Sequence, residues 1–247
     1  LKSLRLNWGL LGRGTKAVRR PVRPEGIRPP FGLDFGSQYN SMKLLSLILY
    51  KWQGEESTVE LTSCEELSSF SFFHRGPLRE HIKFHSRLIA SRTPPGQRQS
   101  IDFDQNLGKC YSWSHPEASG ATITATVLVD GEYPMRVAFT LAAEAIRIFR
   151  DTVSKETIQA AGADQALQCP EIQALFTKFQ NPAEADKLTK IEKDLEEVKG
   201  VVMQSMDDLL KRGESLDQLM QKSKDLSSTS VQFYRTAKKN NQCCKMY

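Results

Sequence analysis

The chain has 247 residues, of which 39% are hydrophobic and 26% charged, so it can hold one or two domains with a substantial core. Its formal net charge of +5 arises within residues 1–41, where eight Lys or Arg face only Glu25 and Asp34; the rest of the chain sums to −1. This distribution excludes a strongly basic nucleic-acid surface over the folded part. No apolar run approaches the roughly 18 residues that a membrane-spanning helix requires.

Residues 1–41 are rich in Arg, Gly and Pro and show neither helical nor strand periodicity. We expect them to be disordered, because such a composition cannot bury enough apolar surface to offset the loss of chain entropy. Met42 is the first methionine and a strand-like run follows it at once, so we expect translation to begin there and the extension to be non-native. An Arg-rich, acid-poor transit peptide is the alternative interpretation.

Residues 42–180 alternate strand-like and helix-like patterns, which predicts an α+β domain with a five-stranded antiparallel sheet sandwiched by helices. The strands are expected from alternating or β-branched runs at residues 44–50, 59–61, 99–103, 109–114 and 121–129. Helices are expected from apolar periodicity and a well-placed Pro134 at residues 78–91, 134–153 and 170–179.

The segment from Leu188 to Asn240 carries an unbroken heptad pattern. Apolar or small residues recur at alternating intervals of three and four, and mostly charged or polar residues lie between them. This pattern is typical of a helix whose apolar seam is buried in a coiled coil. Without partner helices, we expect the segment to be largely disordered, since helix nucleation is unfavourable. The seam positions are Leu188, Ile191, Leu195, Val198, Val202, Ser205, Leu209, Arg212, Leu216, Leu219, Ser223, Leu226, Ser230, Phe233, Ala237 and Asn240.

Arg212 stands in the middle of this seam. A guanidinium has five donors, and leaving a buried charge uncompensated costs about 3–5 kcal/mol. Partner helices must therefore bring acceptors to the same layer, as glutamine side chains would do. A break in the coiled coil or a solvated edge is the alternative for a lone seam arginine, but the seam continues on both sides of Arg212.

Two adjacent thiols, Cys243 and Cys244, lie near the end of the chain. Cys244 fits the C-a-a-X prenylation pattern, and a neighbouring cysteine is a natural palmitoylation site. One lipid chain holds a protein only marginally on a membrane, so two signals are normally needed. The sequence therefore indicates a paired lipid anchor, although Lys245 and Tyr247 depart from the usual residues. Two ordinary thiols on a frayed tail are the alternative.

Positive charge also accumulates at this end of the chain. No acidic residue follows Asp225, while four basic residues do. Near an anionic cytoplasmic leaflet each basic side chain contributes about 1 kcal/mol of attraction, so we expect this tail to favour a membrane surface. A solvated helix face is the alternative. The four are Arg235, Lys238, Lys239 and Lys245.

No pattern in the chain indicates an enzyme, a small-molecule substrate or a cofactor. A phosphate-binding loop and a nucleophile elbow are both missing from the sequence. His81 and His85 have the spacing of a helical metal pair, but no third ligand is evident, so we interpret them as ordinary helix histidines and expect no metal site.

Three parts of the sequence together resemble the lipid-anchored longin R-SNARE, or Ykt-type, family. Residues 68–73 and 132–141 resemble the longin domain, and residues 209–216 resemble the central ionic layer of an R-SNARE motif. The paired cysteines complete the resemblance, which spans residues 42–247. It implies a longin domain at 42–180, an R-SNARE coiled-coil motif at 181–240 and a lipidated tail at 241–247.

This resemblance implies a bundle of four helices with three glutamine-SNARE helices, which would drive vesicle docking and membrane fusion with Arg212 as the ionic layer. It implies a palmitoyl group on Cys243 and a prenyl group on Cys244. The expected locations are the cytosol and the cytoplasmic face of Golgi, ER-derived vesicle, endosomal or vacuolar membranes. A lipid-anchored longin adaptor or tethering regulator that recruits partners without fusion is the alternative.

Longin domains of this family are also expected to fold back on their own SNARE motif, giving a closed cytosolic form and an open membrane form. Phe72, Phe73 and Phe84 are the candidates for an autoinhibitory apolar surface that receives the seam or the lipid. Ordinary core packing is the alternative for each of these side chains.

Overall fold

A computed structural model describes residues 43–104, 108–117, 120–182, 185 and 200–243. The predicted disorder of residues 1–41 falls outside this range. So do four seam positions, one lipidation candidate and the side chains of three further residues. These are Leu188, Ile191, Leu195, Val198 and Cys244, with the side chains of Ala237, Asn240 and Cys243.

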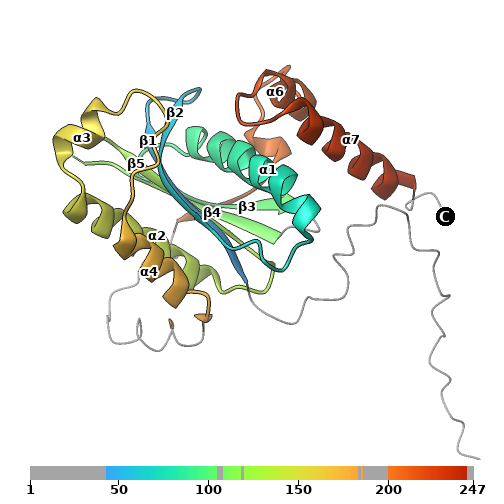
Figure 1. The fold of residues 1–247 in the computed structure, drawn as a ribbon. Helices are drawn as coiled ribbons and strands as arrows, with labels where there is room; N and C mark the ends of the chain where they lie inside the picture. Colours follow the sequence, from blue (N-terminus) through green and yellow to red (C-terminus); the bar gives the residue numbers. More distant parts are fainter. Residues whose placement is uncertain (1–42, 105–107, 118–119, 183–184, 186–199, 244–247) are drawn as a thin grey trace, which may run out of the picture. The chain divides into compact units, whose positions relative to one another are not determined.

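Six strands form one mixed sheet in the order β2-β1-β5-β4-β3-β6 (Figure 1). The first five strands pair antiparallel, as expected. The last strand joins the outer edge of β3 in parallel, with Val201 opposite Arg98 and Ser205 opposite Asp102. The strands are β1 (Leu44–Trp52), β2 (Thr58–Glu65), β3 (Arg98–Asp104), β4 (Gly108–His115), β5 (Ile123–Val129) and β6 (Val201–Ser205).

Helices cover both faces of this sheet, and none of the described helices is long and apolar enough to cross a membrane. The first helix begins at Phe72, six residues before its expected start. Apolar periodicity missed this first part of the helix because Phe72 and Phe73 are exposed and do not continue its buried face. The helices are α1 (Phe72–Ser91), α2 (Met135–Thr152), α3 (Lys155–Ala160), α4 (Pro170–Lys178), the 3₁₀ turn η2 (Asp207–Leu209), α6 (Leu216–Lys222) and α7 (Ser228–Cys243).

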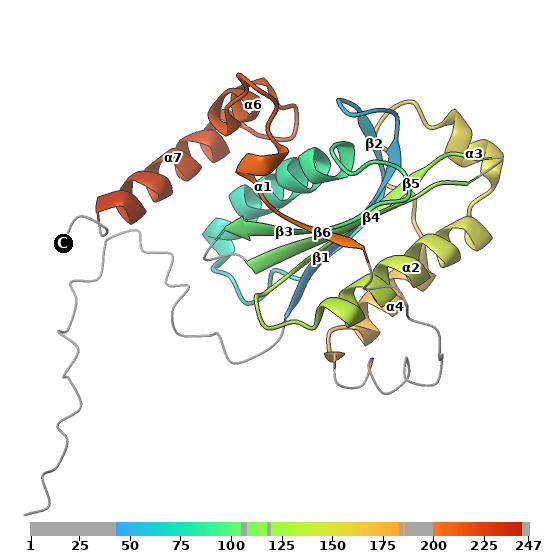
Figure 2. The same ribbon diagram turned by 180° about the vertical axis from the view of Figure 1, so that it is seen from behind.

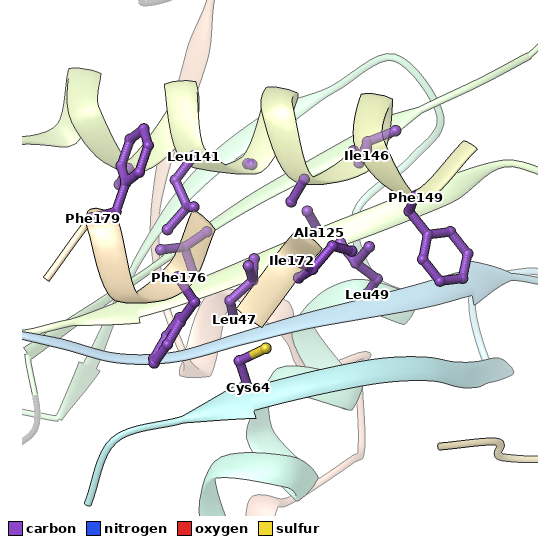
Figure 3. Close-up of a cluster of buried hydrophobic side chains, with 14 of the residues drawn as sticks. Leu47, Leu49, Cys64, Ala125, Leu141, Ile146, Phe149, Ile172, Phe176 and Phe179 are labelled. Atoms are coloured by element: carbon purple, nitrogen blue, oxygen red, sulfur yellow. The ribbon is translucent and has the colours of Figure 1, made fainter. Parts of the chain in front are cut away.

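Each face of the sheet has its own hydrophobic core. The first core lies between the sheet and helices α2 and α4, and Figure 3 shows its side chains pointing inward from both layers. The second core lies on the opposite face, beneath α1, and includes Met206 and Leu209 from the C-terminal part of the chain. The residues labelled in the first core are Leu47, Leu49, Cys64, Ala125, Leu141, Ile146, Phe149, Ile172, Phe176 and Phe179.

The heptad segment was expected to form one continuous helix with partners and to be disordered without them. Over residues 200–243 it is neither one continuous helix nor disordered. It forms β6, η2, α6 and α7 in succession, and it completes both the sheet and the second core. A seam without partner helices leaves its apolar side chains in water. The open edge of β3 and the surface of α1 offer them burial within the same chain, and this tertiary packing overrides the helical periodicity.

Gly108 lets β4 begin beside β5. Its φ is +99°, and an added Cβ would lie 2.1 Å from the backbone oxygen of Val129. We predict that Gly108→Ala lowers the free energy of unfolding by about 3 kcal/mol, because the strained backbone and the clash cannot both relax. Urea denaturation checks this. Gly131→Ala is the control, since its Cβ would meet nothing within 4 Å; equal stability of the two variants would contradict the prediction.

Candidate functional site

The C-terminal segment, residues 200–243, lies against the edge of the sheet and along α1 (Figures 1 and 2). Several seam side chains are thereby withdrawn from solvent. Leu209 is buried in the second core, and Leu216 and Leu219 pack against it. Ser230 is buried and Phe233 is half-buried, whereas Val202 and Ser205 remain exposed on β6. The segment therefore uses part of the seam, together with other residues, to pack on the folded domain.

Helix α7 packs antiparallel on α1. The backbone amide of Ser227, just before α7, donates to Glu80 Oε2 at 2.7 Å, so a side chain of α1 satisfies one of the amides at this helix start. One turn further on, the Ser230 carbonyl oxygen lies 3.0 Å from His81 Nε2. The rings of Phe233 and His74 are 5.5 Å apart. Asp225 lies at Arg87, Ser230 at His81 and Phe233 at His74, so the segment runs along α1 in the opposite direction.

Arg87 of α1 joins the C-terminal segment to two parts of the folded domain. Its Nε and Nη2 donate to the Asp225 carboxylate at 2.5 and 3.0 Å. Its Nη1 and Nη2 donate to Asp164 at 3.1 and 3.0 Å, and Nη1 also reaches the Thr58 carbonyl at 2.9 Å. The Arg87 and Asp225 side chains are only 14% and 4% exposed, so the buried Asp225 carboxylate depends on Arg87 for compensation, whereas Arg87 also pairs with Asp164 and Glu60.

The surrounding charges reinforce the ionised state of this cluster. Burial acts against ionisation of Asp164, but hydrogen bonds from the Glu60 amide, Lys224 and Arg87 lower its pKa to about 2. Burial likewise opposes the charge on Arg87, yet hydrogen bonding to Asp225 and Asp164 raises its pKa. The guanidinium also lies 5.4 Å from the centre of the Tyr50 ring. Arg87 therefore remains charged and fixed in position.

Two further ion pairs connect the middle of the C-terminal segment to the folded domain. Arg92 at the end of α1 bonds both oxygens of Glu214 at 3.1 Å. Lys211 lies 2.8 Å from Glu56, but both side chains are exposed, so this second pair contributes little. The Arg92–Glu214 pair is the stronger of the two because its arginine is largely buried, and one nitrogen, Nη2, donates to both carboxylate oxygens.

His81, His85 and Tyr234 form an aromatic cluster between α1 and α7. The His81 ring lies 5.2 Å from the Tyr234 ring and 6.0 Å from the His85 ring. Burial lowers the pKa of His81, and it lowers the pKa of His85 to about 4, so both are neutral near pH 7. The nitrogens His81 Nε2 and His85 Nδ1 face carbonyl oxygens, and they do not converge on a common position for a metal.

Arg212 lies in the turn between η2 and α6, where it is exposed. No described residue forms an ion pair or hydrogen bond with its side chain. The next residue, Gly213, has a φ of +88°, which a helical backbone would not have. In this arrangement the seam arginine needs no compensating acceptors, because water solvates it.

The three phenylalanines proposed as one apolar surface have different environments. Phe72 and Phe73 are 77% and 84% exposed, whereas Phe84 is 5% exposed and packs edge-on against His85. Thus they do not form one continuous exposed surface. Heptad reading also missed Asp225 and Tyr234, which lie off the seam and make specific contacts. Only their places in the folded segment reveal them.

Two family models match the chain. The Synaptobrevin model matches residues 187–247, and the Longin model, described as a regulated-SNARE-like domain, matches residues 67–175. Among curated proteins, VAMP-like protein YKT61 of Arabidopsis thaliana is 37% identical over 204 residues, covering 82% of this chain and 98% of that protein.

Two fungal proteins give the same result. Synaptobrevin homolog ykt6 of Schizosaccharomyces pombe is 35% identical, covering 82% of this chain and 98% of its own. Synaptobrevin homolog YKT6 of Saccharomyces cerevisiae is 34% identical, covering 77% and 93%. With a longin-type domain, an R-SNARE segment after it and this similarity over most of its length, the chain belongs to the Ykt-type family of longin R-SNAREs.

Proposed function

We propose that this R-SNARE forms a four-helix bundle with three glutamine-SNARE helices and so drives vesicle docking and membrane fusion. The support is the seam from Leu188 to Asn240 with Arg212 at its centre. A continuous helix would bring Arg212 into the buried layer, where glutamine side chains of the partners would supply acceptors. Burial of the apolar seam in the bundle, beyond what ordering the segment costs, would supply the free energy for bringing two membranes together.

We further infer that the arrangement in this structure is the closed, inactive form of the protein. One observation carries this inference: residues 201–205 form a strand in the sheet. The same residues cannot be helical in a bundle while they are paired with β3. The seam side chains Leu209 and Ser230 are also buried against the domain, so a bundle can form over this region only after the segment has been released.

The proposed membrane anchor lies at the far end of the same segment. Cys243, the palmitoylation candidate, is the last residue of α7, and Cys244, the prenylation candidate, follows it. Only Asn241 and Gln242 separate the last seam position from Cys243. A bundle that zippers toward its C-terminus would therefore transmit force directly to the lipids, and the basic tail would hold the anionic leaflet nearby.

Sites of action would be the cytoplasmic faces of Golgi, ER-derived vesicle, endosomal or vacuolar membranes, in exchange with a cytosolic pool. An adaptor that recruits partners without driving fusion is the alternative function. Arg212 separates the two, because a generic coiled coil gains nothing from a buried arginine, whereas a bundle with glutamine partners uses it to align the four helices.

Bundle formation is tested by mixing residues 181–242 with three glutamine-SNARE helices. We predict a large gain in helicity by circular dichroism and an SDS-resistant, heat-stable complex. Arg212→Glu should abolish that complex, because it removes the five donors that the glutamine oxygens would accept from and buries a negative charge in their place, whereas the control Lys222→Glu changes charge off the seam and should be tolerated. A stable complex with Arg212→Glu would favour the adaptor function.

The closed form is tested by Asp225→Asn, which weakens the Arg87 pair without changing a seam residue. We predict that release of the segment becomes easier by about 1–3 kcal/mol, because a largely buried arginine loses one charged partner. Hydrogen exchange at the amides of β6 in the full chain should speed up accordingly, as should bundle assembly. Asp207→Asn, which removes an exposed charge from the same segment, is the control. Equal exchange in both variants would contradict the closed-form assignment.

The closed form should also depend on pH. Because burial lowers the pKa values of His81 and His85, the neutral rings stabilise the packed α7 fully above about pH 6.5, and this contribution is lost as the pH falls toward about 4. Glu80 and Asp164 have lowered pKa values, so their contributions are lost only at more acidic pH. Hydrogen exchange of α7, corrected for intrinsic rates, measures the effect.

The paired variant His81→Gln with His85→Gln should flatten this response between pH 6.5 and 5, while His115→Gln, a change in β4 away from α7, should retain it. If acidification releases α7 equally in all three proteins, other groups control the contact.

A further inference from the structure

Phe72 and Phe73 form an exposed aromatic pair at the start of α1. They are 77% and 84% exposed, and their rings meet edge to face with centres 5.8 Å apart. Among the described residues, the other large hydrophobic side chains that are exposed are Val202 and Met203 on β6. A single exposed apolar residue is ordinary, but two adjacent phenylalanines form a patch that usually serves binding.

The C-terminal segment leaves this aromatic pair uncovered although it packs on the very next residue. Phe233 of α7 contacts the ring of His74, whereas Ser230 and Tyr234 contact His81 and Asp225 contacts Arg87, all further along α1. Hence the packed form of the protein already presents Phe72 and Phe73 to an outside partner.

The antiparallel packing of α7 on α1 places the end of the chain beside the aromatic pair. Cys243 lies ten positions after Phe233 in the same helix, which places it about 15 Å further along the helix axis than Phe233, the residue that contacts His74 near the start of α1. Figures 1 and 2 both show α7 running past this end of α1. The aromatic pair and the proposed anchor at Cys243 therefore lie at the same end of the domain.

Charge at this end favours an anionic surface. The first turn of α1 holds no acidic residue. The guanidinium of Arg75 is held beside the pair by the carbonyl oxygens of Phe70 and Ser68, which leave its charge in place. α7 adds the exposed Arg235, and the sequence has Lys238 and Lys239 later in the same helix. Two carboxylates precede α1: Glu65 pairs with Arg79, and Glu66 accepts from the Ser68 amide and offsets part of the Arg75 charge, so the positive charge at this end comes mainly from α7.

We propose that Phe72 and Phe73 are a membrane-contacting tip that enters the boundary between headgroups and acyl chains of an anionic leaflet. Aromatic side chains flanked by basic residues are suited to that boundary, where the rings lose contact with water and the cations meet lipid phosphates. This inference rests on the proposed anchor at Cys243 and Cys244, because the tip would act beside it. The tip would hold the closed domain against the membrane with α1 pointing toward the lipid.

The test uses the full chain without lipid modification and phosphatidylcholine vesicles with or without phosphatidylserine. Co-sedimentation should show binding to the anionic vesicles. The double variant Phe72→Ser with Phe73→Ser should bind at least about tenfold more weakly, since burying even one phenylalanine is worth that much. Met203→Ser, which removes another exposed apolar side chain, is the matched control and should bind like the original protein. Equal binding of the double variant would overturn the proposal.

The lipid-modified chain distinguishes this tip from a shelter for the protein's own lipid. If the pair contacts the membrane, the double variant partitions less to vesicles; if the pair covers the attached lipid, the variant partitions more, and our proposal is wrong. Bundle formation with glutamine-SNARE helices is measured on the same variants. Normal bundles with unchanged vesicle binding reject the tip alone, whereas failure to form bundles rejects the proposed fusion function instead.

Discussion

The apolar side chains of the C-terminal segment must be buried somewhere, and the rest of the structure follows from where this happens. Within the chain, the open edge of β3 and the surface of α1 accept them: β6 completes the backbone hydrogen bonds of the edge strand, and Met206, Leu209 and Met220 are removed from water. In a bundle, partner helices would bury the seam instead. Because both arrangements use the same residues, they exclude each other.

Arg87 decides how specifically the segment is held on the domain. Burial of apolar side chains is not directional, but a guanidinium between two carboxylates fixes the position of Asp225 on α1. Such a buried pair adds little net stability compared with apolar packing, but removal of one partner would leave a buried charge uncompensated. The hydrogen bond from the Ser227 amide to Glu80 also fixes the position of the segment on α1, since it stabilises the start of α7 at that point.

The turn at Arg212 and Gly213 has different local requirements in the two arrangements. Gly213 takes a left-handed conformation in the packed form and would need a helical one in a continuous seam, a change that glycine makes without steric cost. Arg212 is solvated in the first case and would require acceptors in the second. Neither the charge of Arg212 nor the turn at Gly213 therefore destabilises the packed form. The same two residues are compatible with the packed form and with the proposed bundle.

The five antiparallel strands and the two long helices were predictable from the sequence, because alternating runs such as Ile123–Val129 and the apolar face of α2 reflect local burial. The seam and Arg212 were also visible, since heptad spacing needs no partner to be recognised. The short α3 was missed, as six residues give no periodic signal; its start is fixed by the Ser154 hydroxyl accepting from the Thr157 amide.

The sixth strand, the breakdown of the seam into short elements, and the contacts of Arg87 with Asp225 and of His81 with Ser230 depended on long-range packing. Arg87 and Asp225 are 138 positions apart in the sequence, and His81 and Ser230 are 149 apart. Hydrophobic periodicity carries no information about contacts over such separations. The amino-acid pattern thus specified a surface that has to be buried. Only the tertiary structure decided what buries this apolar surface. The edge of β3 and the surface of α1 lie within the same chain, and they compete for the segment with helices from other proteins.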